Sequence, residues 1–288
     1  MKCLDRNGNL VNENSKQNYV LDKLYNTYIG RFILSGLTKP IISKVGGAVL
    51  SSAFSRIFIS SFIKNNNIDM SIYETKKYNS YNDFFTRKIK KEARPIDYSE
   101  EVFISPCDSK LTVYDISKDS VVSIKNTRYT VNDLLKNGKL ARRYKDGKML
   151  VFRLCVDDYH RYCYVDDGYK SDNKIINGVL HTVNPLANDI YPIYKENSRE
   201  YSLLKSRNFG TILMMEVGAL MVGKICNHHG ERFVCKGQEK GYFEFGGSTV
   251  VLLIQKNAVD IDKDILDNSK NNIETVVKFG EKIGIKKI

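Results

Sequence analysis

The spacing of hydrophobic residues along the chain first indicates a helical segment. Between residues 16 and 64, apolar and aromatic side chains recur every three to four positions, and the clearest repeat runs from Leu21 to Ile33. Polar residues, among them Lys23 and Arg31, occupy the positions between them. A period of three to four residues places the apolar side chains on one face of a helix. The sequence therefore predicts an amphipathic helix in this segment.

The helical pattern continues to residue 64 but contains breaks. Pro40 and the Gly46–Gly47 pair are expected to divide it into two or three shorter helices. Charged residues interrupt every apolar stretch, and the longest uncharged piece, residues 45–55, is shorter than the ~18 residues needed to cross a bilayer. These helices therefore either lie in a membrane interface or pack as core helices on a globular domain, and the pattern alone supports both.

The pattern changes after a polar connector over residues 65–85. Beyond Pro95 the hydrophobic residues form short runs rich in β-branched and aliphatic side chains, with turn-forming pairs between them. We expect an α+β fold in which a mostly antiparallel β body, residues 65–288, follows an amphipathic helical region, residues 1–64. The candidate strands cover residues 111–116, 149–155, 175–183, 211–217, 219–225 and 249–255.

The composition predicts a folded protein with an acidic partner. The 288 residues are 42% hydrophobic, which is enough for a substantial core, and the formal net charge is +12. The sequence contains no zinc-finger spacing or RNA-recognition motif and its basic residues are scattered, so we expect no nucleic-acid partner. An anionic membrane or an anionic small substrate remains as the partner.

The cysteines and the start of the chain bear on location and metals. The six cysteines form no CxxC pair, and the first ten residues, MKCLDRNGNL, lack the apolar core of a secretory signal, so we expect reduced thiols in the cytosol. Residues 226–235, CNHHGERFVC, place two histidines between two cysteines, but not at the short paired spacings of structural zinc sites. Ordinary loop and strand residues are the preferred interpretation there, and no metal is expected.

Four short stretches contain most of the residues capable of chemistry. Each has an ordinary structural explanation: Asp108 suits a turn, His160 suits a hydrogen-bonded structural histidine, and Gly246–Gly247 suits a bulge or strand-entry turn. The last explanation leaves open why a pair of hydroxyl residues, beginning with Ser248, directly follows the glycines. The stretches are NDFFTRK at 82–88, SPCDS at 105–109, RLCVDDYHRY at 153–162 and FGGST at 245–249.

Taken together, these stretches resemble the phosphatidylserine decarboxylase family, and most closely its clostridial type. The resemblance is colinear from about Ser80 to Gln255, and its last stretch is the longest and most specific. The matching stretches are SYNDFFTRKIKKEARPID (80–97), SPCDS (105–109), FRLCVDDYHRY (152–162), GVLHTVNPLA (178–187), MEVGALMVGKI (215–225) and KGQEKGYFEFGGSTVVLL (236–253).

The resemblance implies that the chain cuts itself between Gly247 and Ser248 into two fragments, 1–247 and 248–288, that stay associated. Glycine before the serine permits backbone angles and a close approach that a Cβ would block. The serine hydroxyl would attack the preceding carbonyl, and elimination and hydrolysis would then convert Ser248 into a covalent pyruvoyl group. This group would form a Schiff base with the amine of phosphatidylserine, which leads to CO₂ and phosphatidylethanolamine.

The acid–base motifs of the family fall on Asp108 and His160. The resemblance implies that Asp108 orients the imidazole, that His160 takes the proton of Ser248, and that His160 serves later as a proton donor. Many relatives have a second histidine three residues further on, where this chain has Cys163, so no role is transferred to that position. A glycine often follows the acidic residue in the family, whereas Ser109 stands here.

The resemblance also favours a membrane partner. An enzyme that modifies a lipid must reach a headgroup in a bilayer, so we expect residues 16–64 to bind an anionic membrane peripherally, on the cytoplasmic side of the cell membrane. Arg153 either lies near the phosphate or carboxylate of the substrate, or forms an ion pair with Asp157 or Asp158. The oligomeric state is left open, with a homodimer among the alternatives.

Two other classes of function remain. A serine hydrolase with Ser248 as an ordinary nucleophile is disfavoured, because GGST is not the G-x-S-x-G elbow and a strand, not a helix, is expected to follow it. A non-catalytic lipid-binding homologue stays open because of Cys163 and Ser109. The intact mass of the purified protein distinguishes these classes, since only the decarboxylase gives two chains.

Overall fold

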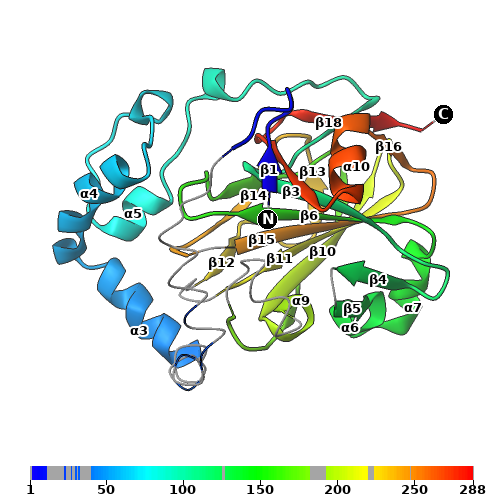
Figure 1. Ribbon diagram of the computed structural model, residues 1–288, viewed down its shortest axis with the longest axis horizontal. Helices are drawn as coiled ribbons and strands as arrows, with labels where there is room; N and C mark the ends of the chain where they lie inside the picture. Colours follow the sequence, from blue (N-terminus) through cyan, green and yellow to red (C-terminus); the bar gives the residue numbers. More distant parts are fainter. Residues whose placement is uncertain are drawn as a thin grey trace.

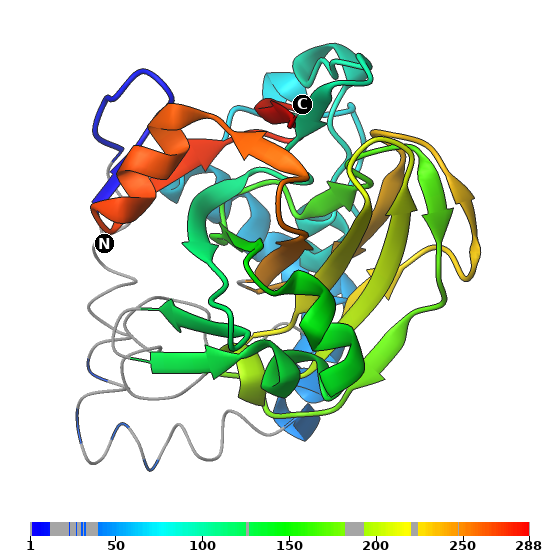
Figure 2. The same cartoon turned by 90° about the vertical axis from the view of Figure 1, so that its right-hand side faces the viewer.

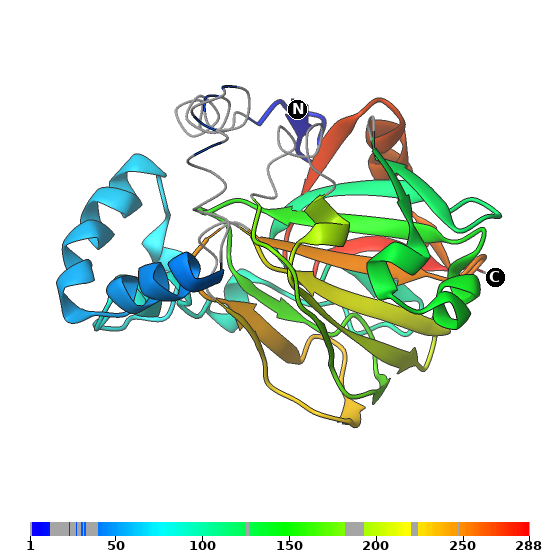
Figure 3. The ribbon, with the colours of Figure 1, turned by 90° about the horizontal axis from the view of Figure 1, so that it is seen from below.

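The computed structural model describes residues 2–11, 40–124, 127–181, 193–219, 224–246 and 248–287, together with the single positions 23, 27, 30 and 32. The predicted helix from Leu21 to Ile33 therefore lies outside the described residues, apart from those positions. A β body forms most of the molecule, and helices α3 and α4 project from one side of it as a separate arm (Figure 1). The same separation is clear when the molecule is seen from below (Figure 3).

The body is built on one large sheet. All neighbouring strands in it are antiparallel, except that β1 pairs in parallel with β17. The predicted α+β fold with a mostly antiparallel body is thus confirmed. In spatial order the strands are β1 (Lys2–Leu4), β17 (Ile273–Val277), β3 (Ser109–Asp115), β6 (Lys148–Leu154), β15 (Ser248–Ile254), β11 (Thr211–Val217), β10 (Arg199–Ser206), β8 (Gly168–Lys170) and β13 (Arg232–Val234), and β9 (Lys174–Ile176) pairs with β10.

Smaller sheets and short helices surround this sheet. One sheet orders β12 (Ile225–Asn227), β14 (Glu239–Phe243) and β7 (Arg161–Cys163), and another orders β16 (Val259–Ile261), β18 (Lys282–Lys286) and β2 (Val102–Ile104). A hairpin joins β4 (Val121–Ile124) and β5 (Thr127–Thr130). The helices of the body are α6 (Val131–Leu135), α7 (Gly138–Ala141), α9 (Ile193–Glu196) and α10 (Lys263–Lys270).

Strand β15 lies inside the core, between β6 and β11. All seven of its residues are buried, because neighbours pair with both of its edges and side chains cover both of its faces. A strand buried on both faces needs apolar side chains at every position, which explains the continuous run VVLLI. The segment after the predicted cut is therefore a central element of the fold.

The strands predicted over residues 111–116, 149–155, 211–217 and 249–255 are confirmed, and they correspond to β3, β6, β11 and β15. Two predictions were too long. In the run 175–183, the strand ends at Ile176, before the Asn177–Gly178 turn pair, and Val179 forms only an isolated bridge. In the run 219–225, Ala219 and Lys224 are outside any strand and β12 begins at Ile225, while the intervening residues lie outside the described ranges.

The helical arm differs from the prediction at the glycine pair. Helix α3 (Pro40–Leu50) begins at the proline, as expected, but runs through Gly46 and Gly47 without a break. The Ser51 amide still donates to the Gly47 carbonyl at 2.9 Å, and glycine costs a helix only about 1 kcal/mol per residue. The arm continues through the 3₁₀ turn η1 (Ala53–Arg56) to α4 (Ile57–Asn65).

The polar connector predicted over residues 65–85 has more regular structure than expected. It contains the 3₁₀ turn η2 (Met70–Ile72) and helix α5 (Tyr81–Phe85). Ser80 caps α5 by accepting a hydrogen bond from the Asp83 amide, and Tyr81, Phe84 and Phe85 are buried. A good cap and three aromatic side chains thus outweigh the polar residues in this segment. A further 3₁₀ turn, η3, covers Lys91–Ala93, and η4 covers Arg142–Tyr144 in the body.

The start of the chain belongs to the body and not to the predicted helical region 1–64. Strand β1 pairs with β17, and the two lie next to α10 at one edge of the molecule (Figure 2). Within the described ranges, no helix combines the length and the apolar character needed to cross a bilayer.

Candidate functional site

The candidate cleavage site lies at the turn between β14 and β15. Gly246 has a φ of +131°, a conformation that glycine adopts easily and other residues rarely adopt. Gly247 lies outside the described residues, and Ser248 begins β15 opposite Leu154 of β6. The hydroxyl of Ser248 is buried and has no hydrogen-bond partner. The Ser248 hydroxyl therefore has no hydrogen bond that would compete with its use as a nucleophile.

His160 lies next to the same turn, just before β7. Strand β7 pairs with β14, and the His160 carbonyl accepts a hydrogen bond from the Phe243 amide at 2.9 Å. The ring centroids of Phe85 and His160 are 4.2 Å apart, and those of Phe85 and Phe245 are 5.1 Å apart. The histidine and the turn that precedes Ser248 therefore contact the same aromatic side chain.

The tautomer of His160 follows from its contacts. Nδ1 lies 2.9 Å from the carbonyl oxygen of Asp158, an acceptor, so Nδ1 carries the proton and Nε2 keeps a lone pair. Nε2 is buried and has no hydrogen-bond partner. Burial lowers the pKa of His160 to about 4, so the imidazole is neutral at neutral pH. A neutral imidazole with a free lone pair is suited to accept a proton from a hydroxyl.

The described geometry does not show the predicted hydrogen bond between Asp108 and His160. Both oxygens of the buried Asp108 carboxylate bind Arg94, at 3.0 Å and 2.6 Å, and Oδ1 also accepts from the Phe279 amide at 2.7 Å. The imidazole is oriented by the backbone at Asp158 instead. A bidentate arginine and a backbone amide occupy the acceptor positions of Asp108, and its role in catalysis remains a prediction.

Arg153 forms an ion pair, as one alternative predicted, but its carboxylate partner is Glu274 and not Asp157 or Asp158, while its proximity to the substrate stays a prediction. Its guanidinium pairs with both carboxylate oxygens of Glu274, and both side chains are buried. Asp158 is paired with Lys110 at 2.6 Å. The sequence could not indicate these partners, because Glu274 lies far along the chain and is brought close only by the sheet.

Cys163 is buried and, since burial raises the pKa of its thiol far above neutrality, it is uncharged. It cannot replace an imidazole as a base. Among the described residues, the sulfur of Cys155 and one carboxylate oxygen each of Asp157 and Asp158 lie within 4.8 Å of one another. Lys110 already neutralises Asp158, and burial raises the pKa of Cys155 to about 11, so this group is a poor metal site.

Sequence reasoning missed Asn82 as a neighbour of the cleavage turn. Its Oδ1 accepts a hydrogen bond from the Phe245 amide at 3.1 Å, and its Nδ2 donates to Ser51 of the helical arm at 3.3 Å. The stretch NDFFTRK was singled out by its residues, but no role followed from them. Helix α5 thus connects the arm with the turn that leads to Ser248.

A sequence model of the family described as phosphatidylserine decarboxylase matches residues 81–285. The chain belongs to the phosphatidylserine decarboxylase family. It is similar to phosphatidylserine decarboxylase proenzyme 2 of Clostridium acetobutylicum, with 50% identity over 94% of each chain. Phosphatidylserine decarboxylase proenzymes of Clostridium tetani (44% identity, 93% of this chain and 92% of the relative) and Clostridium botulinum (42%, 96% and 97%) are also similar.

The region matched by the phosphatidylserine decarboxylase family begins with α5 and includes the whole candidate site. Asp108, His160 and Ser248 all lie within it, as do the neighbouring Asn82 and Phe85. The arm formed by α3 and α4 precedes this region, although the similarity to the clostridial relatives covers most of it.

Proposed function

We propose that the protein is a phosphatidylserine decarboxylase whose pyruvoyl group is made from Ser248 by self-cleavage. Family membership supports the reaction. The observation that supports the self-cleavage is that two buried atoms, the Ser248 hydroxyl and His160 Nε2, have no hydrogen-bond partner, while Phe85 contacts both His160 and Phe245 of the turn before Ser248. Intact-mass analysis of the purified protein tests the proposal, because self-cleavage gives two chains, one of them residues 248–288.

In the proposed cleavage, Ser248 Oγ attacks the carbonyl carbon of residue 247 while His160 Nε2 accepts the hydroxyl proton. The peptide bond breaks, an ester forms, and the proton passes from the imidazolium to the released amine of Ser248. Removal of the α-proton of Ser248 then expels residue 247 as a carboxylate and leaves dehydroalanine, whose hydrolysis releases ammonia and leaves the ketone. The residues fit this chemistry, since the attacking hydroxyl has no competing hydrogen bond. The pyruvoyl ketone supplies an electron sink when CO₂ leaves the lipid headgroup.

The rate of self-cleavage should depend on pH only in the acid range. His160 acts as a base when neutral, and its pKa is about 4. The rate should therefore be level above about pH 5 and fall by about tenfold per pH unit once the pH is below the pKa. Cleavage of freshly synthesised precursor, followed on gels across this range, measures the profile.

Folding must be checked in the same samples, because a histidine buried in its neutral form also destabilises the fold in acid. Its pKa is lower in the folded chain than the ordinary 6.5, so stability decreases as the pH falls from about 6.5 towards 4. Circular dichroism separates this loss from a chemical effect. A rate that falls with a midpoint near pH 6.5, in protein that remains folded, would contradict the assignment of His160 as a buried base.

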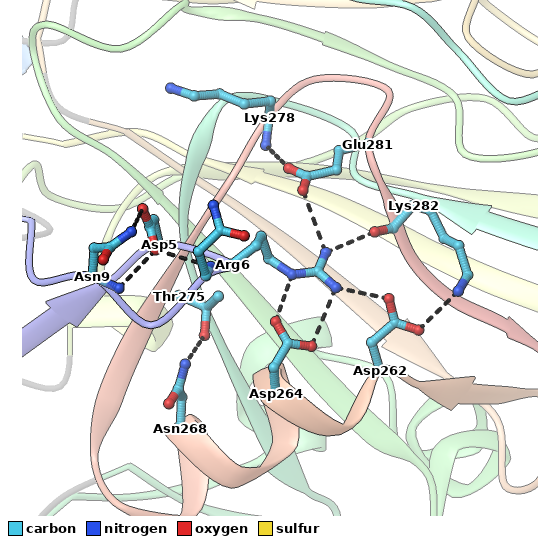
Figure 4. Close-up of polar contacts among 11 residues, drawn as sticks. Asp5, Arg6, Asn9, Asp262, Asp264, Asn268, Thr275, Lys278, Glu281 and Lys282 are labelled. Atoms are coloured by element: carbon cyan, nitrogen blue, oxygen red, sulfur yellow. Dashed lines mark hydrogen bonds and ion pairs between the residues drawn. The ribbon is translucent and has the colours of Figure 1, made fainter.

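We expect the two fragments to stay associated after cleavage. Strand β15 of the small fragment lies between β6 and β11 of the large one, and β17 lies between β1 and β3. Arg6, next to β1, adds an ion cluster (Figure 4). Its guanidinium binds Asp262 at 2.8 Å and Asp264 at 2.6 Å, with Glu281 at 3.5 Å. All three carboxylates belong to residues 248–288, so the N-terminal end of the large fragment and its internal strands both hold the small one.

The arm is proposed to bind an anionic membrane peripherally, on the cytoplasmic side. Phe54, Ile57 and Phe58 are 88%, 76% and 53% exposed, although they are large and apolar. Arg56 and Lys64 are exposed on the same arm. Exposed apolar side chains flanked by cations are typical of helices that lie in the headgroup region of a bilayer.

Replacing Phe54, Ile57 and Phe58 together with serine should reduce binding to anionic vesicles by at least about 100-fold, since burying each side chain contributes roughly 1.5–3 kcal/mol. Vesicle flotation measures the loss. Phe233 and Ile175, which are 58% and 67% exposed on the body, provide the matched control. Their replacement with serine should leave flotation unchanged, and the reverse pattern would place the membrane contact on the body.

These substitutions test the membrane contact better than deletion of residues 1–64. That deletion also removes β1 and Arg6, which bind the small fragment. Loss of binding in a deletion variant could then result from damage to the body.

The alternative functions make different predictions. A serine hydrolase is disfavoured because Ser248 begins a buried strand, whereas a nucleophile elbow leads into a helix. A hydrolase or a non-catalytic lipid-binding homologue would remain one 33.0 kDa chain. Only the decarboxylase proposal requires a cut before Ser248.

A further inference from the structure

A cavity of about 230 Å³ lies beside helix α5 and the start of β7. Arg161 on its wall directly follows His160 in the chain, and Arg87 lies two residues after Phe85, which contacts the His160 ring. The cavity is therefore close to the candidate cleavage site without including its residues. It is lined by Glu74, Lys76, Tyr78, Asp83, Thr86, Arg87, Lys88 and Arg161.

Arg87 is a buried cation with incomplete hydrogen bonding. Its side chain is almost fully buried, its Nε has no partner, and no carboxylate in the described part of the chain pairs with it. Its Nη2 donates to the Tyr73 hydroxyl at 3.2 Å, and its Nη1 is 3.5 Å from two backbone carbonyl oxygens. Its charge also lies over the rings of Tyr73, at 4.4 Å, and Phe84, at 4.8 Å, which stabilise a cation but leave its N–H groups without acceptors. A buried charge with so few partners is unfavourable unless an anion completes them.

Arg199 in the same protein shows how a buried guanidinium is satisfied by the chain alone. Its nitrogens donate to four backbone carbonyl oxygens at 2.8–2.9 Å, and Nε is one of the donors. Arg87 has no bond as short as these, and its Nε has none. The difference indicates that the partner of Arg87 is not a residue of the described chain.

The other charges of the cavity leave it positive. Lys76 pairs with Asp83 at 2.6 Å. Arg161 pairs with Glu239 at 2.7 Å and donates to the Thr86 carbonyl. Of the remaining charged residues on the wall, Arg87 and Lys88 are cations and Glu74 is the one acid. An anion that enters the cavity thus meets an excess of positive charge next to an incompletely bonded arginine.

We propose that this cavity binds a phosphate group through Arg87 and Lys88, and that the phosphate is that of the headgroup of the lipid substrate. The inference rests on the function proposed above for the identity of the lipid. A guanidinium presents paired N–H groups that match phosphate oxygens, which an ammonium does not. The position of the cavity next to α5 agrees with this assignment, because the same helix contacts the membrane arm through Phe62 and Tyr81.

The first test measures binding without catalysis. The full-length Ser248→Ala chain is titrated with inorganic phosphate, and separately with a short-chain soluble phosphatidylethanolamine, by calorimetry. Both should bind and compete with each other, and Arg87→Gln in the same background should weaken both by about 10- to 100-fold, as for loss of a charge-assisted hydrogen bond. Arg143→Gln, at an exposed position away from the cavity, is the matched control.

The outcomes of this test are distinct. Phosphate binding without competition from the lipid would assign the cavity to free phosphate and overturn the lipid assignment. Unchanged affinity of both ligands in Arg87→Gln would overturn the site. Because the assay needs no turnover, it decides the binding site even if the proposed self-cleavage is wrong.

The second test measures activity with a short-chain soluble phosphatidylserine. Arg87→Gln should raise KM by about 10- to 100-fold with kcat within a few-fold, and Arg87→Lys should give an intermediate KM. Before KM is compared, the intact mass of each Arg87 variant must show that it is cleaved as the wild type is. If Arg87→Gln fails to fold, the exposed Lys88→Gln should still raise KM by several-fold. Wild-type KM in Lys88→Gln together with wild-type KM in any folded Arg87 variant would refute the proposal.

Discussion

Ser248→Ala should remain a single 33.0 kDa chain without decarboxylase activity, whereas the wild-type protein should consist of residues 1–247 and 248–288. The substitution removes the hydroxyl that is proposed to attack the preceding carbonyl and then to leave with residue 247 when dehydroalanine forms. Intact-mass spectrometry measures the cleavage. The new N-terminus of the small wild-type fragment should also resist Edman degradation, because a ketone stands where the amine would be.

The chain offers a matched control for this experiment. Ser202 of β10 is also buried in the large sheet, and its hydroxyl also has no hydrogen-bond partner. Ser202→Ala should cleave and decarboxylate as the wild type does, since only its position differs. An uncut wild-type chain with full activity would refute the self-cleavage hypothesis.

His160→Ala should slow self-cleavage by about 10²- to 10⁴-fold, the usual contribution of a general base. The structure agrees with a role as a base because Nε2 is unpartnered and the low pKa keeps the ring neutral. A time course of chain cleavage on gels measures the rate. The folded state of the variant is checked by its thermal unfolding, because the histidine ring packs on Phe85.

Cys163→Ala is the control for His160→Ala, since the thiol is buried, neutral and only three residues away. It should cleave at close to the wild-type rate. Rapid cleavage in His160→Ala, or a complete block in Cys163→Ala, would transfer the role of base to the cysteine and overturn the assignment.

Asp108→Asn should also slow self-cleavage, but the structure changes the reason. The carboxylate holds Arg94 and the Phe279 amide, and residue 279 belongs to the segment that begins with Ser248. Removal of the Asp108 charge leaves the Arg94 guanidinium without its ionic partner and weakens the attachment of the segment that begins with Ser248. The cleavage rate and the thermal midpoint should therefore fall together, whereas a direct effect on the imidazole would lower the rate alone.

Local sequence was sufficient for several elements. The uninterrupted run from Val250 to Leu253 predicted a buried strand, and β15 has that character because both of its edges and both of its faces are covered. Pro40 predicted the start of α3 correctly, because proline lacks the amide needed inside a helix. The glycine pair did not end α3, since the penalty for glycine is small enough to be outweighed by the rest of the helix.

The candidate site residues were proposed from the sequence, which offers a serine after glycine and acid–base residues elsewhere in the chain. The stretches that supply Asp108, His160 and Ser248 were identified in this way, through their resemblance to a family. The partners of these residues depended on tertiary structure. Pairing of β7 with β14 brings His160 to the turn, and the sheet brings Glu274 to Arg153 from 121 positions away.

The sequence by itself therefore determined the α+β class and the buried strand that follows Ser248, because these depend on residue type and short-range periodicity, whereas the chemistry expected there came from the resemblance to a family. The tertiary structure alone decided that Asp108 binds Arg94, that a backbone carbonyl orients His160, and that Arg87 has no anionic partner among the described residues. Hydrogen bonds and ion pairs need atoms within about 3–4 Å. Only the folded chain brings distant residues to such separations.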